Sequence, residues 1–323
     1  MTTIRAFPRL HLGLFDLGTA TPRKYGGIGV SVDGLPTVVT AERSPTSDLS
    51  LFPVLDHQAT EDISRIIADL SSLHSLPPMR IDVHVPVPQH VGLGAKTAIL
   101  LAVVQALHTE GRKPIDKTAL IRSSGRGGTS GIGIHAFFEG GLIMDGGHRS
   151  SPPRTYAPSS ATSPHDLPPL VARISMPIQW RVTLLLPSGE RLRGRAEEAF
   201  FAAHTPLSHG DIERVIALAV SGLAASVASD DFRTFADVLR EFQSIGFKAR
   251  EIANQSRATR MLLTSLWDIN ECAAGMSSMG PLLFAITEAS NASAVAQISE
   301  VSAAYEAQLL GTFAFRNAGH QID

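Results

Sequence analysis

Polar and apolar residues alternate along much of the first ninety positions, a pattern typical of half-buried strands. The predicted strands cover 9–18 (with a turn at its end), 26–34, 36–42 and 80–88. One segment breaks this alternation. Residues 61–73 place three isoleucines and Leu70 at helical spacing, which predicts an amphipathic helix between the third and fourth strands.

The middle of the chain is more apolar. Residues 95–107 are apolar nearly all round, which predicts a buried helix. A shorter helix is expected over 114–123, then a helix over Ser130–Phe138 and a strand over Gly141–Met144. Ser, Pro and Thr dominate 149–169, so we expect a long loop there, and such loops are often lids or binding loops.

Helical patterns dominate the second half, after a strand predicted over 178–187. The predicted helices are 209–227, 229–254, 281–289 and 294–309, with a final strand over 312–319. Strands and helices are mixed without a regular strand–helix–strand repeat, which favours an α+β fold. We predict an N-terminal domain over 1–175 and a C-terminal domain over 176–323.

Composition narrows the class of protein. The 323 residues suit two ordinary domains or one large one, and 44% hydrophobic residues suffice for a sizeable core. A net charge of −2 gives no reason to expect nucleic acid or an anionic membrane as partner. The single cysteine, Cys272, excludes an intrachain disulfide framework. With no signal-like start and no run of about 18 apolar residues, we expect a cytoplasmic protein without a membrane span.

The elbow 92-GLGAKTA-98 joins the fourth strand to the buried helix. Gly92 and Gly94 allow backbone turns that other residues avoid. A helix that starts here offers free N–H groups to an anion, and Lys96 and Thr97 add a charge and a hydroxyl. The spacing is not that of a Walker loop. The elbow therefore predicts either an anion site or a close-packed turn.

Two further glycine-rich segments carry candidate chemistry. In 125-GRGGTSGIG-133 the candidate anion contacts are Arg126, Gly127, Gly128, Thr129 and Ser130. Alternatively the segment is a plain capped turn before a helix. In 145-DGGH-148, Asp145 and His148 flank a Gly-Gly turn and suit binding of a Mg²⁺–diphosphate unit or proton transfer, although such turns are usually structural.

Two more segments complete the set. In 275-GMSSMGP-281, Ser277 and Ser278 predict a second anion cradle before a helix, or a helix cap with Pro281 near its first position. Near the start, charged and aromatic residues gather on two predicted strands and suit a small charged substrate. They are Arg9, His11, Asp16, Arg23, Lys24 and Tyr25.

Together these segments resemble a known family. The elbow, with 86-PVPQHV-91 before it, and 275-GMSSMGP-281 are similar to phosphate motifs of the GHMP kinase superfamily, which implies a two-domain α+β fold. The segments 9-RLHLGLFDLG-18, 25-YGGIGVSV-32, 125-GRGGTSGIG-133 and 139-EGGLIMDGGH-148 resemble a non-kinase branch, the β-ribofuranosylaminobenzene 5′-phosphate synthases. The resemblance runs from about residue 5 to residue 320.

The resemblance implies a phosphoribosyl C-glycosyltransferase, usually a homodimer. Such an enzyme joins phosphoribosyl diphosphate to an aromatic carboxylate, with loss of pyrophosphate and CO₂ and with Mg²⁺ as the expected cofactor. Implied roles follow residue by residue. The catalytic residues would be Asp145, His148, Lys24 and Asp16, and Asp145 would also bind the metal. The acceptor would contact Arg9, His11, Tyr25 and Gly27. The donor phosphates would bind to Gly92, Gly94, Lys96, Thr97, Arg126, Gly127, Gly128, Thr129, Ser130, Ser277 and Ser278.

The elbow departs from the family pattern. The pterin-pathway branch has a Ser-Gly-Thr-Gln-like run after Gly-Leu-Gly, where this chain has 95-AKTA-98. Ala98 cannot make the hydrogen bonds of a glutamine amide, and Lys96 adds a charge. This difference favours a pyrazole carboxylate acceptor, as in C-nucleoside antibiotic pathways of the formycin and pyrazofurin type. A 4-hydroxybenzoate or 4-aminobenzoate acceptor in methanopterin synthesis is the alternative. The rivals are an ATP-dependent GHMP kinase and a non-catalytic binding protein.

Overall fold

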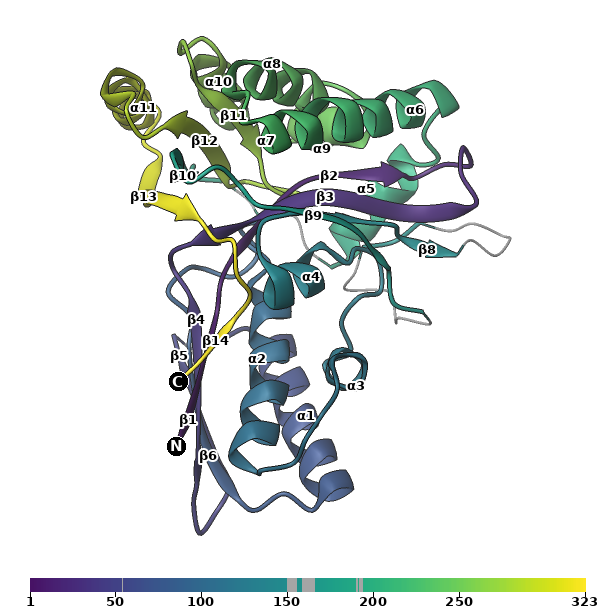
Figure 1. The fold of residues 1–323 in the computed structure, drawn as a ribbon, viewed down its shortest axis with the longest axis vertical. Coiled ribbons are helices and arrows are strands. Elements are labelled where there is room, and N and C mark those ends of the chain that lie inside the picture. The colour runs from purple at the N-terminus through teal and green to yellow at the C-terminus, as the bar shows by residue number, and fades with distance from the viewer. Residues whose placement is uncertain (54, 150–155, 159–165, 190, 192–193) are drawn as a thin grey trace.

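The computed structural model describes residues 1–53, 55–149, 156–158, 166–189, 191 and 194–323. A five-stranded sheet has the strand order β14-β1-β4-β6-β5. Its strands are β1 (Thr2–Ala6), β4 (Thr37–Arg43), β5 (Asp48–Phe52), β6 (Met79–His84) and β14 (Gln321–Ile322). Neighbours are antiparallel except β5 and β6. Because β14 pairs with β1, the two chain ends lie side by side (Figure 1).

Three helices lie beside this sheet: α1 (His57–His74), α2 (Ala95–Glu110) and α3 (Lys117–Ser123). Helix α1 begins at Asp56, whose carboxylate accepts the N–H of Ala59, a usual helix cap. Helix α2 is buried along almost its whole length because it lies between the sheet and α1. The predicted buried helix is therefore confirmed, and the amphipathic one is confirmed with four more residues at its start.

The larger, nine-stranded sheet is antiparallel at every pair, with the order β11-β12-β10-β13-β3-β7-β9. Strands β2 and β8 also pair with β3. The strands are β2 (Arg9–Asp16), β3 (Arg23–Asp33), β7 (Leu142–Asp145), β8 (His148–Arg149), β9 (Leu170–Ile174), β10 (Trp180–Leu186), β11 (Ala273–Met276), β12 (Leu283–Glu288) and β13 (Gln308–Phe315). Because β3 and β13 pair, this sheet contains strands from both sides of the predicted 175/176 boundary, which does not coincide with a boundary between sheets.

Helices of the second half cover one face of the nine-stranded sheet, and α4 (Ile132–Glu139) lies on the opposite face (Figure 1). The covering helices and the π-helical segment η1 are α6 (His209–Ala217), η1 (Leu218–Ala224), α7 (Ala225–Ser229), α8 (Phe232–Gln243), α9 (Gly246–Ala253) and α10 (Arg257–Trp267). Helix α5 (Arg195–His204) lies beside the end of β2 and β3, and α11 (Ala292–Ala304) lies at the β12 end. Trp180 of β10 packs against Phe232 and Phe235 of α8, which joins the sheet to its helical layer.

Three predictions for the second half were wrong. Residues 281–289, predicted as a helix, contain strand β12 (Leu283–Glu288), which is buried on both faces between β10 and β11. The predicted helix 229–254 is two helices, because Gly246 has a φ of 57° and the chain turns there. The predicted helix 294–309 ends at Ala304, and its last residues begin β13. The predicted loop 149–169 lies largely outside the described residues.

Among the residues that the structure describes, one continuous helical segment, His209–Ser229, is long and apolar enough to cross a membrane by length and composition alone. Buried helices of compact proteins satisfy the same criterion. In this fold the segment packs on the nine-stranded sheet, where Leu218 and Leu223 are buried in the same core cluster as Trp180. Its apolar character is therefore accounted for by the core.

Candidate functional site

A cavity of about 170 Å³ lies at the N-terminal end of α2. Segments from five parts of the chain meet there: the start of β2, the elbow, the loop before α4, the start of α5 with Glu197, and the turn between β11 and β12. The side chains and glycines that matter below are Arg9, Gly92, Gly94, Lys96, Thr97, Arg126, Gly127, Ser130, Ser278 and Met279. The structure thus brings together most of the residues assigned to donor phosphates.

The elbow is held in place from both sides. Gly92 has a φ of +106°, and a Cβ on it would lie 2.4 Å from the carbonyl oxygen of Ser277. Gly94 has a φ of +74°, and its Cβ would lie 2.9 Å from Cζ of Arg9. The hydroxyl of Ser277 donates to the carbonyl of Gly92 at 2.7 Å. Both glycines are therefore required by close approach, and Ser277 is a buried support of the elbow.

The start of α2 presents unpaired amides. Its first flanking residue is Gly94, which provides no side-chain cap. The amides of Thr97 and Ala98 bond to the carbonyl of Gly94, whereas those of Ala95 and Lys96 have no acceptor among the described residues. Two free N–H groups beside the positive end of a 16-residue helix form a suitable site for a phosphate oxygen.

Three cations surround the cavity. Arg9 donates from Nη1 to the carbonyl of Gly92 at 2.8 Å, but its buried Nε has no partner among the described residues. Burial, and then the charge of Arg126, lower the pKa of Arg9 to about 10. Burial also lowers the pKa of Arg126, whose Nε donates to the hydroxyl of Thr97 at 3.2 Å. An anion bound between these guanidinium groups would reduce their mutual repulsion and would replace the hydrogen bonds to water that burial removes.

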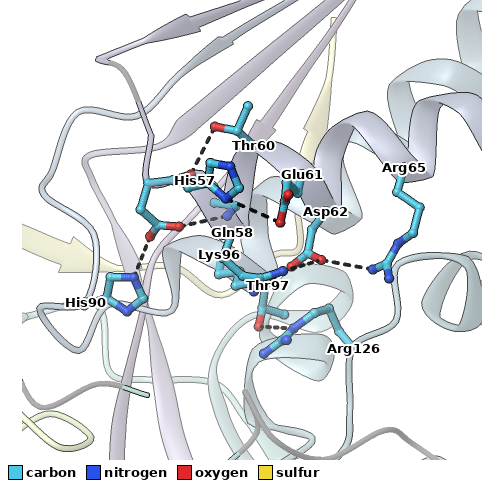
Figure 2. A network of polar contacts seen from close by, with 12 residues as sticks. His57, Gln58, Thr60, Glu61, Asp62, Arg65, His90, Lys96, Thr97 and Arg126 are labelled. Atoms are coloured by element: carbon cyan, nitrogen blue, oxygen red, sulfur yellow. Dashed lines mark hydrogen bonds and ion pairs between the residues drawn. The ribbon is translucent and has the colours of Figure 1, made fainter. Parts of the chain in front are cut away.

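Lys96 also faces the cavity, and Figure 2 shows how it is held. Its ammonium lies 2.6 Å from the carboxylate of Asp62 on α1. Asp62 also binds Arg65 at 3.0 Å, and its charge partly offsets the burial of Arg126. Asp62 is thus the counter-ion of the cation cluster. Nothing in the sequence pattern distinguished it from the other acidic residues of α1.

A chain of polar groups runs across the neighbouring strands. Nε2 of His11 lies 3.2 Å from Oγ of Ser130, which in turn donates to Asp145 at 3.3 Å. Burial lowers the pKa of His11 well below its ordinary value, and the charges of Arg9 and Lys248 lower it further. His11 is therefore a neutral imidazole at neutral pH, able to accept or donate a proton through one ring nitrogen.

Asp145 is fully buried at the end of β7. Its two oxygens accept the N–H of Gly147 at 2.8 Å and the N–H of Gly131 at 3.0 Å. Burial raises the pKa of Asp145 to about 7, although these N–H groups act in the opposite direction. Because both oxygens are occupied and inaccessible, the carboxylate does not fit a direct Mg²⁺ ligand. In the described part of the chain, no group of three or more His, Cys, Asp or Glu side chains could hold a metal ion.

Three candidate residues from two different sequence motifs meet outside the cavity lining: His148, Lys24 and Tyr25. Nδ1 of His148 lies 2.9 Å from the carboxylate of Asp166, and its ring meets Tyr25 edge-on. The ammonium of Lys24 lies 5.6 Å from the centre of the Tyr25 ring. The sequence analysis named all three residues but placed His148 with Asp145, and Lys24 and Tyr25 with the charged residues of 9–25, so their meeting was not predicted. Asp166 was missed within the predicted loop.

Asp16 makes local contacts that stabilise a turn. Its carboxylate accepts the N–H groups of Gly18 and Thr21, at 2.8 and 2.7 Å, and so closes the turn between β2 and β3. It does not line the cavity. Gly27 leaves room for the ring of His11, because a Cβ on Gly27 would lie 3.3 Å from Nε2 of that histidine. Gly128 and Thr129 are buried behind the cavity wall.

A buried ion pair on α9 also escaped the sequence analysis. The ammonium of Lys248 lies 2.5 Å from the carboxylate of Glu251 and donates to the carbonyl of Ser278 at 2.8 Å. Both charged side chains are buried. No glycine-rich motif surrounds Lys248, so only the tertiary structure connects it to the cavity.

Comparison with solved structures defines the class of protein. Homoserine kinase from Cytophaga hutchinsonii matches over 100% of this chain and 97% of its own, with a TM-score of 0.69 and 14% identity. Phosphomevalonate kinase from Streptococcus pneumoniae has a TM-score of 0.69 at 10% identity, over 97% and 98% of the two chains. Mevalonate diphosphate decarboxylase from Staphylococcus aureus reaches 0.65 at 13%, over 100% and 98%. At such identities the likeness shows the fold alone, which is that of the GHMP kinases, as predicted.

Curated relatives define the family. The beta-ribofuranosylphenol 5'-phosphate synthase of Archaeoglobus fulgidus is 30% identical over 325 residues, covering 100% of both chains. The protein of the same name from Methanothermobacter thermautotrophicus is 29% identical over 91% of each chain. No protein-family model matches the chain. The chain belongs to the beta-ribofuranosylphenol 5'-phosphate synthase family and is an enzyme of this kind, which confirms the resemblance read from its motifs.

Proposed function

We propose that this protein joins the ribose of phosphoribosyl diphosphate to an aromatic carboxylate, with loss of CO₂ and pyrophosphate. The observation that carries the proposal is the cavity where Arg9, Arg126 and Lys96 meet the free amides of α2. Such a site suits a donor with several phosphate groups. The relatives' name describes an aryl riboside 5'-phosphate, which is the product of this reaction.

The proposed chemistry balances in three bond changes. The bond from C1 of the ribose to the diphosphate oxygen breaks, and its electron pair leaves with the diphosphate. The ring carbon that carries the carboxylate forms a bond to C1. The carboxylate then leaves as CO₂, and its electron pair restores the aromatic ring. In this scheme the cations of the cavity stabilise the departing charge, which is preorganised electrostatic stabilisation.

His11 is the residue we propose beside the acceptor. It lies next to the cavity lining through Ser130, and the lowered pKa keeps its imidazole neutral. A neutral imidazole can hold the proton of an acceptor hydroxyl while the ring carbon attacks C1, and return it to the oxygen when CO₂ leaves. His148, Lys24 and Tyr25, which were assigned to catalysis or acceptor binding, form the next polar group along β3 and β8.

The acceptor is best supported as a hydroxylated benzoate. The relatives' name contains a phenol, which corresponds to 4-hydroxybenzoate after decarboxylation. The case for a pyrazole carboxylate depended partly on Ala98, but Ala98 is buried in α2 and does not line the cavity. Lys96 remains as the difference from the family pattern that faces the cavity, so an azole carboxylate stays the alternative.

We propose that Mg²⁺ enters with the diphosphate of the donor rather than residing on Asp145, whose carboxylate does not fit a metal. A homodimer and a cytoplasmic location complete the proposal. Sedimentation of the purified chain tests the dimer. Activity with donor but without Mg²⁺ would contradict the metal requirement.

One incubation tests the proposed function. The protein is mixed with phosphoribosyl diphosphate, Mg²⁺ and a panel of hydroxybenzoate, aminobenzoate and pyrazole carboxylates. Released CO₂, pyrophosphate and product mass are measured together. We expect CO₂, pyrophosphate and the product to form in equal amounts. The rate of the reaction should fall about a hundredfold or more in Arg126→Ala. Arg122→Ala, an exposed arginine on α3, is the matched control and should retain activity. ATP consumption without donor dependence would instead support a kinase.

A further inference from the structure

The peptide between Ser278 and Met279 is fixed by two side chains of the α9 region. Lys248 donates to the carbonyl of Ser278 at 2.8 Å, and Gln255 donates to the carbonyl of Met279 at 2.9 Å. On the other side, the N–H of Ser278 donates to the carbonyl of His11 at 2.9 Å. Two successive carbonyls of this turn, in residues that line the cavity, are thus bound by side chains of α9 and of the segment just after it.

Peptide geometry fixes the direction of the next donor. The Ser278–Met279 bond is not among the cis peptides, so its C=O and N–H point in opposite directions. With the carbonyl bound to Lys248, the N–H of Met279 points away from α9. Met279 lines the cavity, and its N–H has no acceptor among the described residues. A backbone donor with no acceptor among the described residues therefore belongs to a residue of the cavity lining, on the side of its peptide opposite Lys248.

Lys248 strengthens this donor as well as orienting it. Its ammonium is buried with Glu251 at 2.5 Å, and burial lowers the pKa of Lys248 and raises the pKa of Glu251. A cation on a carbonyl oxygen polarises the peptide and makes its N–H a better hydrogen-bond donor. A second unpaired donor, the buried Nε of Arg9, belongs to the same cavity.

We infer that the N–H of Met279 binds a phosphate oxygen of the substrate's diphosphate group, and that Lys248 and Gln255 are the positioning residues that orient it. The inference rests on the proposed function, because it names a contact within the proposed donor site. The ligand class is an inorganic or organic diphosphate. The serines of this turn, which the sequence suggested as anion contacts, would then act through the backbone, with Ser277 supporting the elbow.

The test observes the Met279 amide directly. The full chain is labelled with ¹⁵N-methionine, which gives few signals because the sequence has seven methionines. A Met279→Leu variant identifies the Met279 signal, and inorganic diphosphate with Mg²⁺ is titrated into the wild-type protein. We expect a downfield shift of the Met279 proton that saturates together with the heat of binding measured by calorimetry. An unshifted Met279 signal at saturating diphosphate would overturn the inference while leaving the proposed function intact.

Variants test the role of Lys248. In Lys248→Met we expect diphosphate affinity to fall about tenfold or more and the Met279 shift to shrink, with partial recovery in Lys248→Arg. Lys117→Met, on the exposed ion pair with Glu139, is the control and should bind as wild type does. Wild-type affinity and an unchanged Met279 shift in a folded Lys248→Met would refute the positioning role. Absence of diphosphate binding by the wild-type chain would refute the inference and the proposed function together.

Discussion

Asp145→Asn should change how stability depends on pH. Burial raises the pKa of Asp145 from 3.8 to about 7 in the folded chain. Between those values the folded protein binds a proton that the unfolded chain has released. This stabilisation is fully present below the unfolded pKa and is lost as pH rises through about 7. At about 1.4 kcal/mol per unit, the whole effect is about 4 kcal/mol.

Chemical denaturation of both proteins, from about pH 5 to about pH 8.5, measures this effect. Asparagine does not titrate, so the advantage of the wild type should shrink by about 1.4 kcal/mol per unit below pH 7 and then level off. The amide of asparagine also faces the N–H of Gly131 or Gly147, which adds a pH-independent cost. Asp69→Asn, an exposed carboxylate on α1, is the control, since little hydration is lost there on folding. A wild-type advantage that stays constant with pH would refute the reasoning.

Three further predictions address the elbow, its charge and the thiol. Gly92→Ala should lower the free energy of unfolding by about 2 kcal/mol or more, because the added Cβ would meet the carbonyl oxygen of Ser277. Gly125→Ala is the control: Gly125 also has a positive φ, but open space surrounds it, so the loss should be about 1 kcal/mol. Equal losses of the two variants in thermal unfolding would contradict this prediction. Lys96→Met should raise KM for the donor about tenfold or more with little change in KM for the acceptor, and an unchanged donor KM would remove Lys96 from the site. Cys272 is buried and burial raises its pKa to about 12, so a thiol reagent should react only when the chain unfolds, and rapid labelling of the folded protein would disprove this.

The local patterns predicted most elements of the first half, although they missed strands β1 and β5. The isoleucines of α1 and the apolar run of α2 needed no tertiary information, because each pattern allows one helix of suitable length. In the second half, 281–289 was misread because an apolar segment buried on both faces has no period of its own. Only the position of β12 between β10 and β11 makes it a strand.

By itself, the sequence determined the family and singled out the elbow and several other residues that line the cavity, because glycine spacing and the charges within it are local features. The tertiary structure alone decided which polar groups meet. It joined His11 to Asp145 through Ser130, assigned Asp16 to a turn, and placed Lys248 behind the cavity. These contacts link residues far apart in the chain, and their energies depend on burial, which sequence spacing does not encode.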